Sequence, residues 1–393
     1  MRIPIIGVVL AGFVTLPVHA RAQTKLTLVP SVAVSAISDD NIFSTASPSA
    51  DQTTLVSPGV QGGIETPRAA LLAAYSIDML RSADFAALND LEARRHGMVD
   101  AAFRDTPRLA LDAYGRYDRT DEAGALNFET GVLLPRAPAT RWELGPSFAY
   151  KASPVVTING QYTWVQESLA PVVATDEHVG RFLVSRQISA RASVSAGYLG
   201  RRFVSDTGID TSNAAIAGAS YELRPFTMLT VQGGPRFSST KGLEPELVAS
   251  LTRRAPGRIA YSVDGWRGES IILGVIGPVE VTSATARLAV PVRRRIEVGG
   301  AAGVFQSDSL FQGDARVYHT QVVASWSPRP LYNIAASYAA DFQRGDIRTA
   351  LLNDSHIVRH VFLLQCTVAP RMSRTFGPTV PLGPLADPQR RHP

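Results

Sequence analysis

The sequence predicts an all-β fold, an antiparallel transmembrane β-barrel of about 18 strands (about 16–20), with short periplasmic turns and longer external loops. Three observations predict it: long runs of alternating apolar and polar residues, short turns that alternate with longer polar loops, and a low content of charged residues. Hydrophobic residues make up 45% of the 393-residue chain and charged residues only 19%, against about a quarter in soluble domains. After the N-terminus, no window holds the ~18 uninterrupted apolar residues of a membrane helix.

The clearest alternating run extends from Tyr332 to Phe342. One face carries aromatic and aliphatic residues, and the other carries polar residues such as Asp341. A period of two residues over this length indicates a strand with one apolar and one polar face. Similar runs of about 10–14 residues recur from Leu26 to Val368. They are longer than the roughly 5–6 residues of soluble sandwich strands and long enough to cross a bilayer at a tilt.

The connections between these runs alternate between two kinds. Short proline-containing turns suit the periplasmic side, because proline cannot donate to a strand ladder. They are expected at Thr66-Pro67, Thr106-Pro107, Ser153-Pro154, Arg224-Pro225, Ala255-Pro256-Gly257 and Pro328-Arg329-Pro330. The longer polar loops expected on the external side are Asp39 to Asp51, Arg81 to Asp90, Ser205 to Ser212, Ser307 to Asp314 and Arg344 to Asp354.

Two segments fit the alternating pattern less well. Residues 69–91 are rich in Ala and Leu, and we interpret them as strand with a short helical piece near residues 85–88. Between Tyr114 and Lys151 the phase of the strands is weakly defined, and Leu133-Leu134-Pro135 fits either a strand or a loop.

The chain divides into three predicted parts. Residues 1–22 form a signal peptide, with Arg2 in its basic region, a short apolar stretch, and small residues around Ala20 for cleavage. A retained membrane anchor is the alternative, disfavoured because the stretch is short and interrupted by proline and glycine. Residues 23–369 form the barrel, and residues 370–393 form a disordered tail rich in proline and arginine.

The charges indicate a pore wall or a surface rather than a nucleic-acid site. Lys and Arg total 39 against 34 Asp and Glu, and the arginines are spread along the strands rather than clustered as nucleic-acid binding requires. The polar faces predict a mildly cationic lumen that attracts anions; the alternative is that these arginines pair with acids and brace the wall. The candidate pore-lining residues are Arg181, Arg191, Arg201, Arg236, Arg258, Arg287, Arg295, Arg359, Glu177, Glu246, Asp264 and Asp341.

Several short motifs follow one another in an order that resembles a known family. They are Val29-Pro30-Ser31, Asp39-Asp40-Asn41-Ile42-Phe43, Ser57-Pro58-Gly59-Val60, Asp176-Glu177-His178, Gly234-Pro235-Arg236 and Glu244-Pro245-Glu246-Leu247. In these the chain resembles the outer-membrane β-barrel proteins of bacterial exopolysaccharide and exosortase-linked gene clusters, also called β-barrel porins of type 2. The resemblance implies a bacterial outer-membrane location and a role in moving or displaying polysaccharide, with no catalytic residues to transfer. The chain departs from the usual barrel ending, because it continues past Val368 to Pro393.

Other chemistry has weaker support. His356 and His360 have the spacing of a helical zinc motif, but on a strand they lie too far apart to share a metal. The acidic residues between Asp39 and Asp51 lack the spacing of a calcium loop. No glycine-flanked serine elbow marks a hydrolase, and the single cysteine, Cys366, excludes an intrachain disulfide. We therefore expect neither an enzyme, nor a bound metal, nor a cofactor.

The sequence supports two functions from different classes. The first is a passive outer-membrane channel or export component for polysaccharide or other anionic solutes. The second is a non-conducting barrel that anchors a secretion or surface assembly. The expected partners are outer-membrane lipid and, for the first function, polysaccharide and periplasmic export proteins; no nucleic acid is expected.

Overall fold

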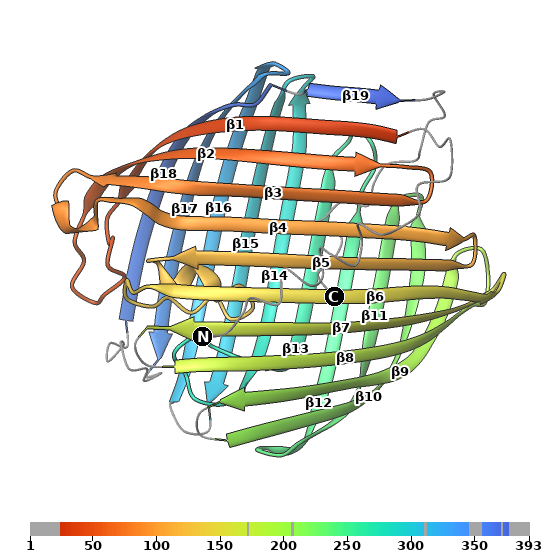
Figure 1. Cartoon of the computed structure of the whole chain (residues 1–393). Helices are drawn as coiled ribbons and strands as arrows, with labels where there is room; N and C mark the ends of the chain where they lie inside the picture. The colour runs from red at the N-terminus through yellow and green to blue at the C-terminus, as the bar shows by residue number, and fades with distance from the viewer. Residues whose placement is uncertain are drawn as a thin grey trace, which may run out of the picture.

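In the computed structural model, the chain forms a closed antiparallel β-barrel (Figure 1). The structure describes residues 24–170, 173–205, 208–309, 313–345, 356–370 and 372–376. Within these ranges, each long strand pairs with its neighbours in sequence, and β1 pairs with β18 to close the wall. The predicted 18-stranded barrel is therefore confirmed. The predicted signal peptide, residues 1–22, lies outside the described residues.

The barrel strands of the described chain are 11 to 17 residues long, enough to cross a bilayer at a tilt. Their bounds are β1 Thr24–Asp39, β2 Asp51–Glu65, β3 Ala69–Ser82, β4 Asp90–Thr106, β5 Leu109–Thr120, β6 Ala139–Ser153, β7 Val156–Leu169, β8 Val173–Gln187, β9 Ala192–Ser205, β10 Gly208–Arg224, β11 Thr227–Ser238, β12 Gly242–Arg253, β13 Ala260–Ser270, β14 Val279–Arg293, β15 Ile296–Ser309, β16 Gly313–Arg329, β17 Tyr332–Gly345 and β18 His356–Val368.

A short further strand, β19 (Met372–Phe376), extends the closing ladder. β18 pairs with β1 from Val32↔Val368 to Asp39↔Val361, and β19 then pairs with Leu28 to Thr24 of the same strand. The register is unchanged across the break at Ala369 and Pro370, so β19 continues β18 rather than adding a nineteenth barrel strand. We expected disorder from residue 370 onward, whereas residues 372–376 form this strand; residues 377–393 lie outside the described part.

The connections at one end of the barrel are short turns, as predicted, and include Thr66-Pro67 and Pro330. The other end carries the longer loops and is the external end by the usual asymmetry of such barrels. Here the sequence prediction is partly wrong. Strands β9 and β10 extend through most of the expected loop 205–212, and β15 and β16 through most of 307–314. The long connections that the pattern missed are residues 121–138 and 271–278.

The segment 69–91 has the expected composite form. β3 occupies residues 69–82, and a single 3-10 turn follows at Ala86–Leu88 before β4 begins. Between Tyr114 and Lys151 the uncertain phase is now defined: β5 ends at Thr120, β6 begins at Ala139, and Leu133-Leu134-Pro135 belongs to the loop between them.

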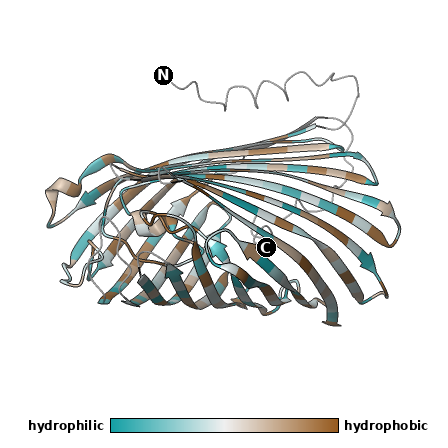
Figure 2. Cartoon of the chain, turned by 90° about the horizontal axis from the view of Figure 1, so that it is seen from below, coloured by the Kyte–Doolittle hydropathy of each residue, from teal (hydrophilic) through white to brown (hydrophobic). Residues whose placement is uncertain are grey.

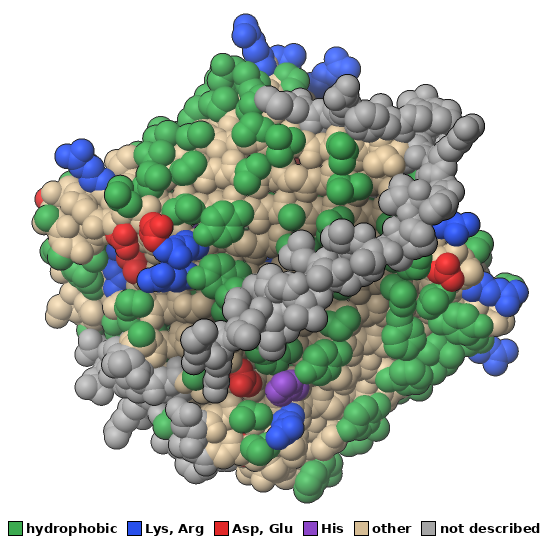
Figure 3. All heavy atoms as spheres, in the orientation of Figure 1, with side chains coloured by type: hydrophobic (Ala, Val, Ile, Leu, Met, Phe, Trp, Pro, Cys, Tyr) green, Lys and Arg blue, Asp and Glu red, His purple; other side chains and the backbone are tan. Residues whose placement is uncertain are grey.

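The outer wall of the barrel is apolar. Residues that alternate along each strand expose aliphatic and aromatic side chains, such as Val60 on β2 and Leu364 on β18. Figure 3 shows the visible wall covered largely by hydrophobic side chains, with Lys, Arg, Asp and Glu gathered toward the strand ends. Exposed aromatic residues lie toward both ends of the wall, for example Phe237 and Phe342 externally and Tyr221 and Tyr332 near the turns. An apolar band between aromatic girdles is the surface of a lipid-embedded barrel.

Among the described residues, none of the helices reaches the length and apolar character needed to cross a membrane.

Candidate functional site

The inside of the barrel differs sharply between its two halves. Inward side chains in the external half are buried, as Glu167, Phe203 and Ser307 show with 2%, 2% and 0% exposure. Inward side chains nearer the turns remain accessible: Arg287 is exposed and Ser325 partly so. The external half of the lumen is therefore constricted, and the fillers are two loops that fold inward between the walls (Figures 1 and 2).

The larger filler is the β5–β6 loop, residues 121–138. It begins with a 3-10 turn at Ala123–Leu126 and then crosses to strands on another part of the wall. Gln343 of β17 holds it there, because its side chain accepts a hydrogen bond from the Leu133 N–H at 2.7 Å and donates to the Leu133 carbonyl at 3.4 Å. Gly131, at φ +64°, lies against the ring of Phe305, where a Cβ atom would come within 3.0 Å of the ring. The loop is thus attached to strands far from its origin.

The second filler is the β13–β14 loop, residues 271–278, which packs against the first. Asn127 joins the two loops: its amide donates to the Val132 carbonyl at 2.9 Å and accepts from the Leu273 N–H at 3.0 Å. Apolar side chains of both loops and of the surrounding inward wall form one buried cluster, which we call the lumen cluster. Its buried members are Ala123, Leu126, Val132, Leu133, Leu134, Ala137, Ala139, Leu169, Ile272, Leu273, Val275, Val279, Val281, Ala315, Val317 and Ile357.

Ion pairs fix the start of the β5–β6 loop to the wall. Glu122 accepts from Arg94 of β4 and from Arg359 of β18, and Arg359 also pairs with Asp39 at 2.6 Å. Burial alone would raise the pKa of Glu122, but the nearby guanidinium groups, Arg359 foremost, lower it to about 2. Glu122 is therefore ionised at neutral pH and bridges β4 to β18 through the loop.

The neighbouring carboxylate behaves differently. Asp121 pairs with Arg136 at 3.0 Å and lies 3.9 Å from Arg94. Burial raises its pKa above the ordinary value in spite of these two guanidinium groups. Asp121, Glu122 and Arg136 belong to the loop, and Arg94 belongs to the wall strand β4. Because these acids and arginines pair with one another, the attachment point of the loop is an ion-pair network rather than a site with unpaired charge.

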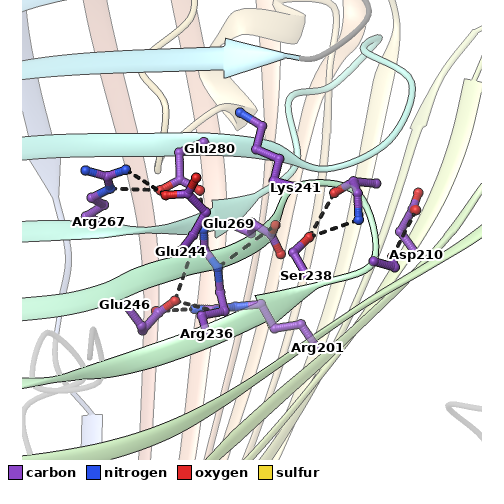
Figure 4. A network of polar contacts seen from close by, with 12 residues as sticks. Arg201, Asp210, Arg236, Ser238, Lys241, Glu244, Glu246, Arg267, Glu269 and Glu280 are labelled. Atoms are coloured by element: carbon purple, nitrogen blue, oxygen red, sulfur yellow. Dashed lines mark hydrogen bonds and ion pairs between the residues drawn. The ribbon is translucent and has the colours of Figure 1, made fainter.

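A second ionic network lies where β12 and β13 separate (Figure 4). Their ladder runs only from Leu247↔Arg267 to Arg253↔Tyr261, so the external residues 242–246 of β12 have no partner on β13. Arg236 is fully buried there between Glu246, at 3.1 Å, and Glu280.

The same carboxylates hold two further arginines. Arg201 binds both oxygens of Glu246, at 3.0 and 2.8 Å, and Arg267 binds Glu280 and Glu244, each at 3.0 Å. Glu269 completes the group, with its Oε1 4.0 Å from the Arg236 Nε. Five strands, β9 and β11 to β14, are thereby tied together beside the filled half of the lumen.

The structure separates the predicted pore-lining residues into two groups. Strand alternation points one group inward: Arg181, Arg201, Arg236, Arg287, Arg359, Glu177, Glu246, Asp264 and Asp341. The other group, Arg191, Arg258 and Arg295, lies exposed in the short turns rather than on strands. Alternation cannot assign a face in a turn, which is why these three were misplaced.

Among the inward arginines, pairing with acids is common. Arg201, Arg236 and Arg359 each contact at least one carboxylate. Arg181 instead donates to the side chain of Gln232. The geometry around these arginines agrees with the bracing alternative, and the attraction of anions rests on Arg181 and Arg287.

Two inward histidines, His96 and His319, were not among the predicted pore-lining residues. His96 of β4 lies between Asp118 of β5, at 2.8 Å, and Asp78 of β3, at 3.6 Å. His319 contacts Asp341 at 2.6 Å. Both histidines occupy inward positions of alternating strands, so strand phase could have found them. The pairing of His96 across three strands could not, because the register is invisible in a single sequence.

The weaker sequence candidates have structural roles. Asp39 accepts from the Asn41 N–H at 2.9 Å and binds Arg359, and the Asn41 amide donates to the carbonyls of Thr45 and Val358. Cys366 is an exposed free thiol. Within the described ranges, no three His, Cys, Asp or Glu side chains are grouped so that they could hold a metal ion.

The comparisons with known proteins concern the fold. No protein-family model matches the sequence, and no curated protein matches it. Among solved structures, the barrel is similar to OpdQ of Pseudomonas aeruginosa, with a TM-score of 0.46, 11% identity, and coverage of 89% of this chain and 99% of that chain. It is also similar to OccK9 (OpdG) of the same species, with a TM-score of 0.47, 9% identity, and coverage of 89% and 98%.

A third neighbour is the siderophore receptor PirA from Pseudomonas aeruginosa, with a TM-score of 0.41, 9% identity, and coverage of 87% of this chain and 80% of that chain. The location follows from the closed barrel, its apolar wall and its aromatic girdles. The chain is an outer-membrane β-barrel.

Proposed function

We propose that the protein is a passive outer-membrane channel whose external half is constricted by the β5–β6 and β13–β14 loops. The observation that carries this proposal is the contrast inside the barrel: inward groups are buried by the lumen cluster externally and remain accessible toward the turns. Pore width and lining charge set selectivity in such channels. The two loops would then determine both, because they occupy the narrowest part.

The preferred solute, in this proposal, is a polysaccharide or another polar, anionic molecule that enters from the periplasmic side. The family resemblance supports polysaccharide, and inward Arg181 and Arg287 support weak attraction of anions. Pairing of the other arginines with carboxylates limits that attraction. We assign the barrel no catalytic reaction.

Planar-bilayer recordings test this function. We expect the purified barrel to conduct, and the reversal potential in a salt gradient to show a mild preference for anions. The double variant Arg181→Gln/Arg287→Gln should reduce that preference, because it removes two inward guanidinium groups for which the described structure shows no carboxylate partner. Addition of an acidic polysaccharide to the periplasmic side should reduce the current more than an uncharged dextran of similar size.

A matched control is Arg258→Gln, which removes the same charge from an exposed turn and should leave the reversal potential unchanged. An ion-tight barrel under all conditions would overturn the channel and favour the non-conducting anchor. A conducting barrel that shows no anion preference would overturn only the choice of solute.

A further inference from the structure

Two arginines and a histidine lie side by side on the outside of the barrel, near the external ends of β16, β17 and β18. The ladders align Arg316 with Arg344, and Arg344 with His356. All three are exposed. They occupy the same alternating positions as the outward-facing Tyr318 and Phe342. Their side chains therefore face the surroundings of the barrel and not its lumen.

This row is unfavourable in the isolated barrel. Like charges directly opposite each other on neighbouring strands destabilise a sheet. Within the described part of the chain, Arg344 and His356 form no ion pair, and the Arg316 guanidinium donates to the neutral side chain of Gln306 at 3.1 Å. Two outward carboxylates, Asp308 and Asp314, lie opposite each other in the register one row further out. Asp308 also binds Lys241 at 3.1 Å.

The height of the row identifies its surroundings. Two residues deeper along each strand, Tyr318 aligns with Phe342, in the row that belongs to the external aromatic girdle. Two strand residues span about 7 Å along the strand, or about 5 Å along the membrane normal at a tilt of roughly 40°. Aromatic girdles mark the edge of the hydrocarbon region, so arginines placed ~5 Å beyond one lie among the charged headgroups of the outer leaflet.

A second sector of the wall repeats the arrangement. On β3 to β6, the outward residues Tyr75, Tyr117 and Trp142 form one cross-strand row with Gly97. Two residues further out, Arg95 aligns with Arg119; Arg95 also contacts Glu92. An aromatic row with a pair of arginines two residues further out thus recurs on a separate part of the barrel.

We propose that Arg316, Arg344 and His356 bind the phosphate groups of an anionic, phosphorylated glycolipid in the outer leaflet. Phosphate accepts bidentate hydrogen bonds from arginine and carries the negative charge that offsets the repulsion between Arg316 and Arg344. The imidazole of His356 adds an N–H donor to the row. The apolar wall below the row receives the acyl chains of the same lipid. The site binds a structural lipid and is independent of solute passage through the lumen.

The test uses the full-length barrel in detergent, titrated with diphosphorylated lipid A and followed by native mass spectrometry. We expect binding by the wild type, and at least tenfold weaker binding by the double variant Arg316→Gln/Arg344→Gln; a tenfold change corresponds to about 1.4 kcal/mol. Lipid A with its phosphates removed should bind the wild type no better than the variant. Thermal unfolding gives a second readout: without lipid the variant should be at least as stable as the wild type, and with lipid A it should gain less.

The matched control is Arg68→Gln/Arg294→Gln, which removes the same charge from exposed turn residues at the opposite end. It should bind lipid A like the wild type. Equal binding by the wild type and by Arg316→Gln/Arg344→Gln would overturn the proposal. So would full competition by inorganic phosphate at concentrations comparable to the lipid, because that result would indicate a simple anion site.

Discussion

The external and periplasmic halves of this barrel are built from the same strands yet have different interiors. In the external half, Ser307 is fully buried and Gln343 is engaged with the β5–β6 loop. In the periplasmic half, Arg287 on β14 and Ser325 on β16 reach solvent. The difference comes from the connections and not from the wall, since both halves of every strand alternate in the same way. The wall forms a cylinder with a lipid-compatible outer surface, and the two inward loops determine which part of its lumen is accessible to solvent.

The two halves also differ in how charge is held. Externally, Arg236 and Arg359 are buried and bound to carboxylates. Such buried pairs add little net stability while intact, but their disruption leaves charges without compensation. The external half should therefore be the more sensitive to single substitutions, and the predictions below test that difference.

The largest effect is expected from Arg236→Met. It removes the cation between Glu246, Glu269 and Glu280, and breaking a buried network of this kind costs about 3–5 kcal/mol. Urea unfolding of the folded barrel in detergent micelles, followed by tryptophan fluorescence, measures the loss. Arg287→Met in the open half is the control and should change the free energy of unfolding little; equal losses from both variants would remove the proposed difference between the halves.

The next effect concerns accessibility. In a Cys366→Ser background, we expect Ser325→Cys to react rapidly with a polar maleimide and Ser307→Cys to react slowly, because only the first position is open to solvent. The ratio of labelling rates, read by gel shift or mass spectrometry, should be about 100-fold if the loops open rarely, as a local opening free energy of about 3 kcal/mol implies. Similar rates at both positions would show that the loops do not fill the external half.

A smaller effect is expected from Asn127→Ala, which removes the link between the two loops. Two buried partners, the Val132 carbonyl and the Leu273 N–H, lose a hydrogen bond, at a cost of about 1–3 kcal/mol. Hydrogen exchange of the loop amides should accelerate while the strand amides remain protected. Asn333→Ala, which removes a 3.0 Å hydrogen bond to Ser327 near the turns, should leave loop exchange unchanged.

The smallest expected effect is that of pH on the attachment of the β5–β6 loop through Glu122. The folded pKa of Glu122, about 2, lies below its ordinary value of 4.5. Its ionised form therefore stabilises the docked loop above pH 4.5, and this contribution is lost only as the pH falls through about 2. Loop protection, corrected for intrinsic exchange, should thus not fall between pH 7 and pH 5; the raised pKa of the neighbouring Asp121 acts in the opposite direction and favours the docked loop as the pH falls. Glu122→Gln should lower it at pH 7, and a loss of wild-type protection near pH 5 would contradict the assignment.

The strands of the wall could be predicted from the sequence, because a strand between lipid and a polar lumen must alternate apolar and polar side chains. That constraint placed Arg201, Arg236 and Asp341 on the inward face, and it failed for Arg191 and Arg295, which lie in turns. The alternation also could not predict the loops, because residues packed inside the lumen do not face lipid and therefore show no two-residue apolar–polar period. Leu133 and Leu134 were visible as an apolar run, but their contact with Gln343 of β17 depends on the closed barrel.

The central claim is that the β5–β6 loop sets the width of the channel, and single-channel conductance tests it most directly. Residues 123–136 would be replaced by a short Gly-Ser linker, and wild type and variant recorded in planar bilayers under the same salt and voltage. Retention of heat-modifiable migration on a detergent gel confirms that the variant barrel is folded. We expect the variant to conduct several-fold more than the wild type, because the replaced residues include five members of the lumen cluster. Equal conductance in a folded variant would contradict the account.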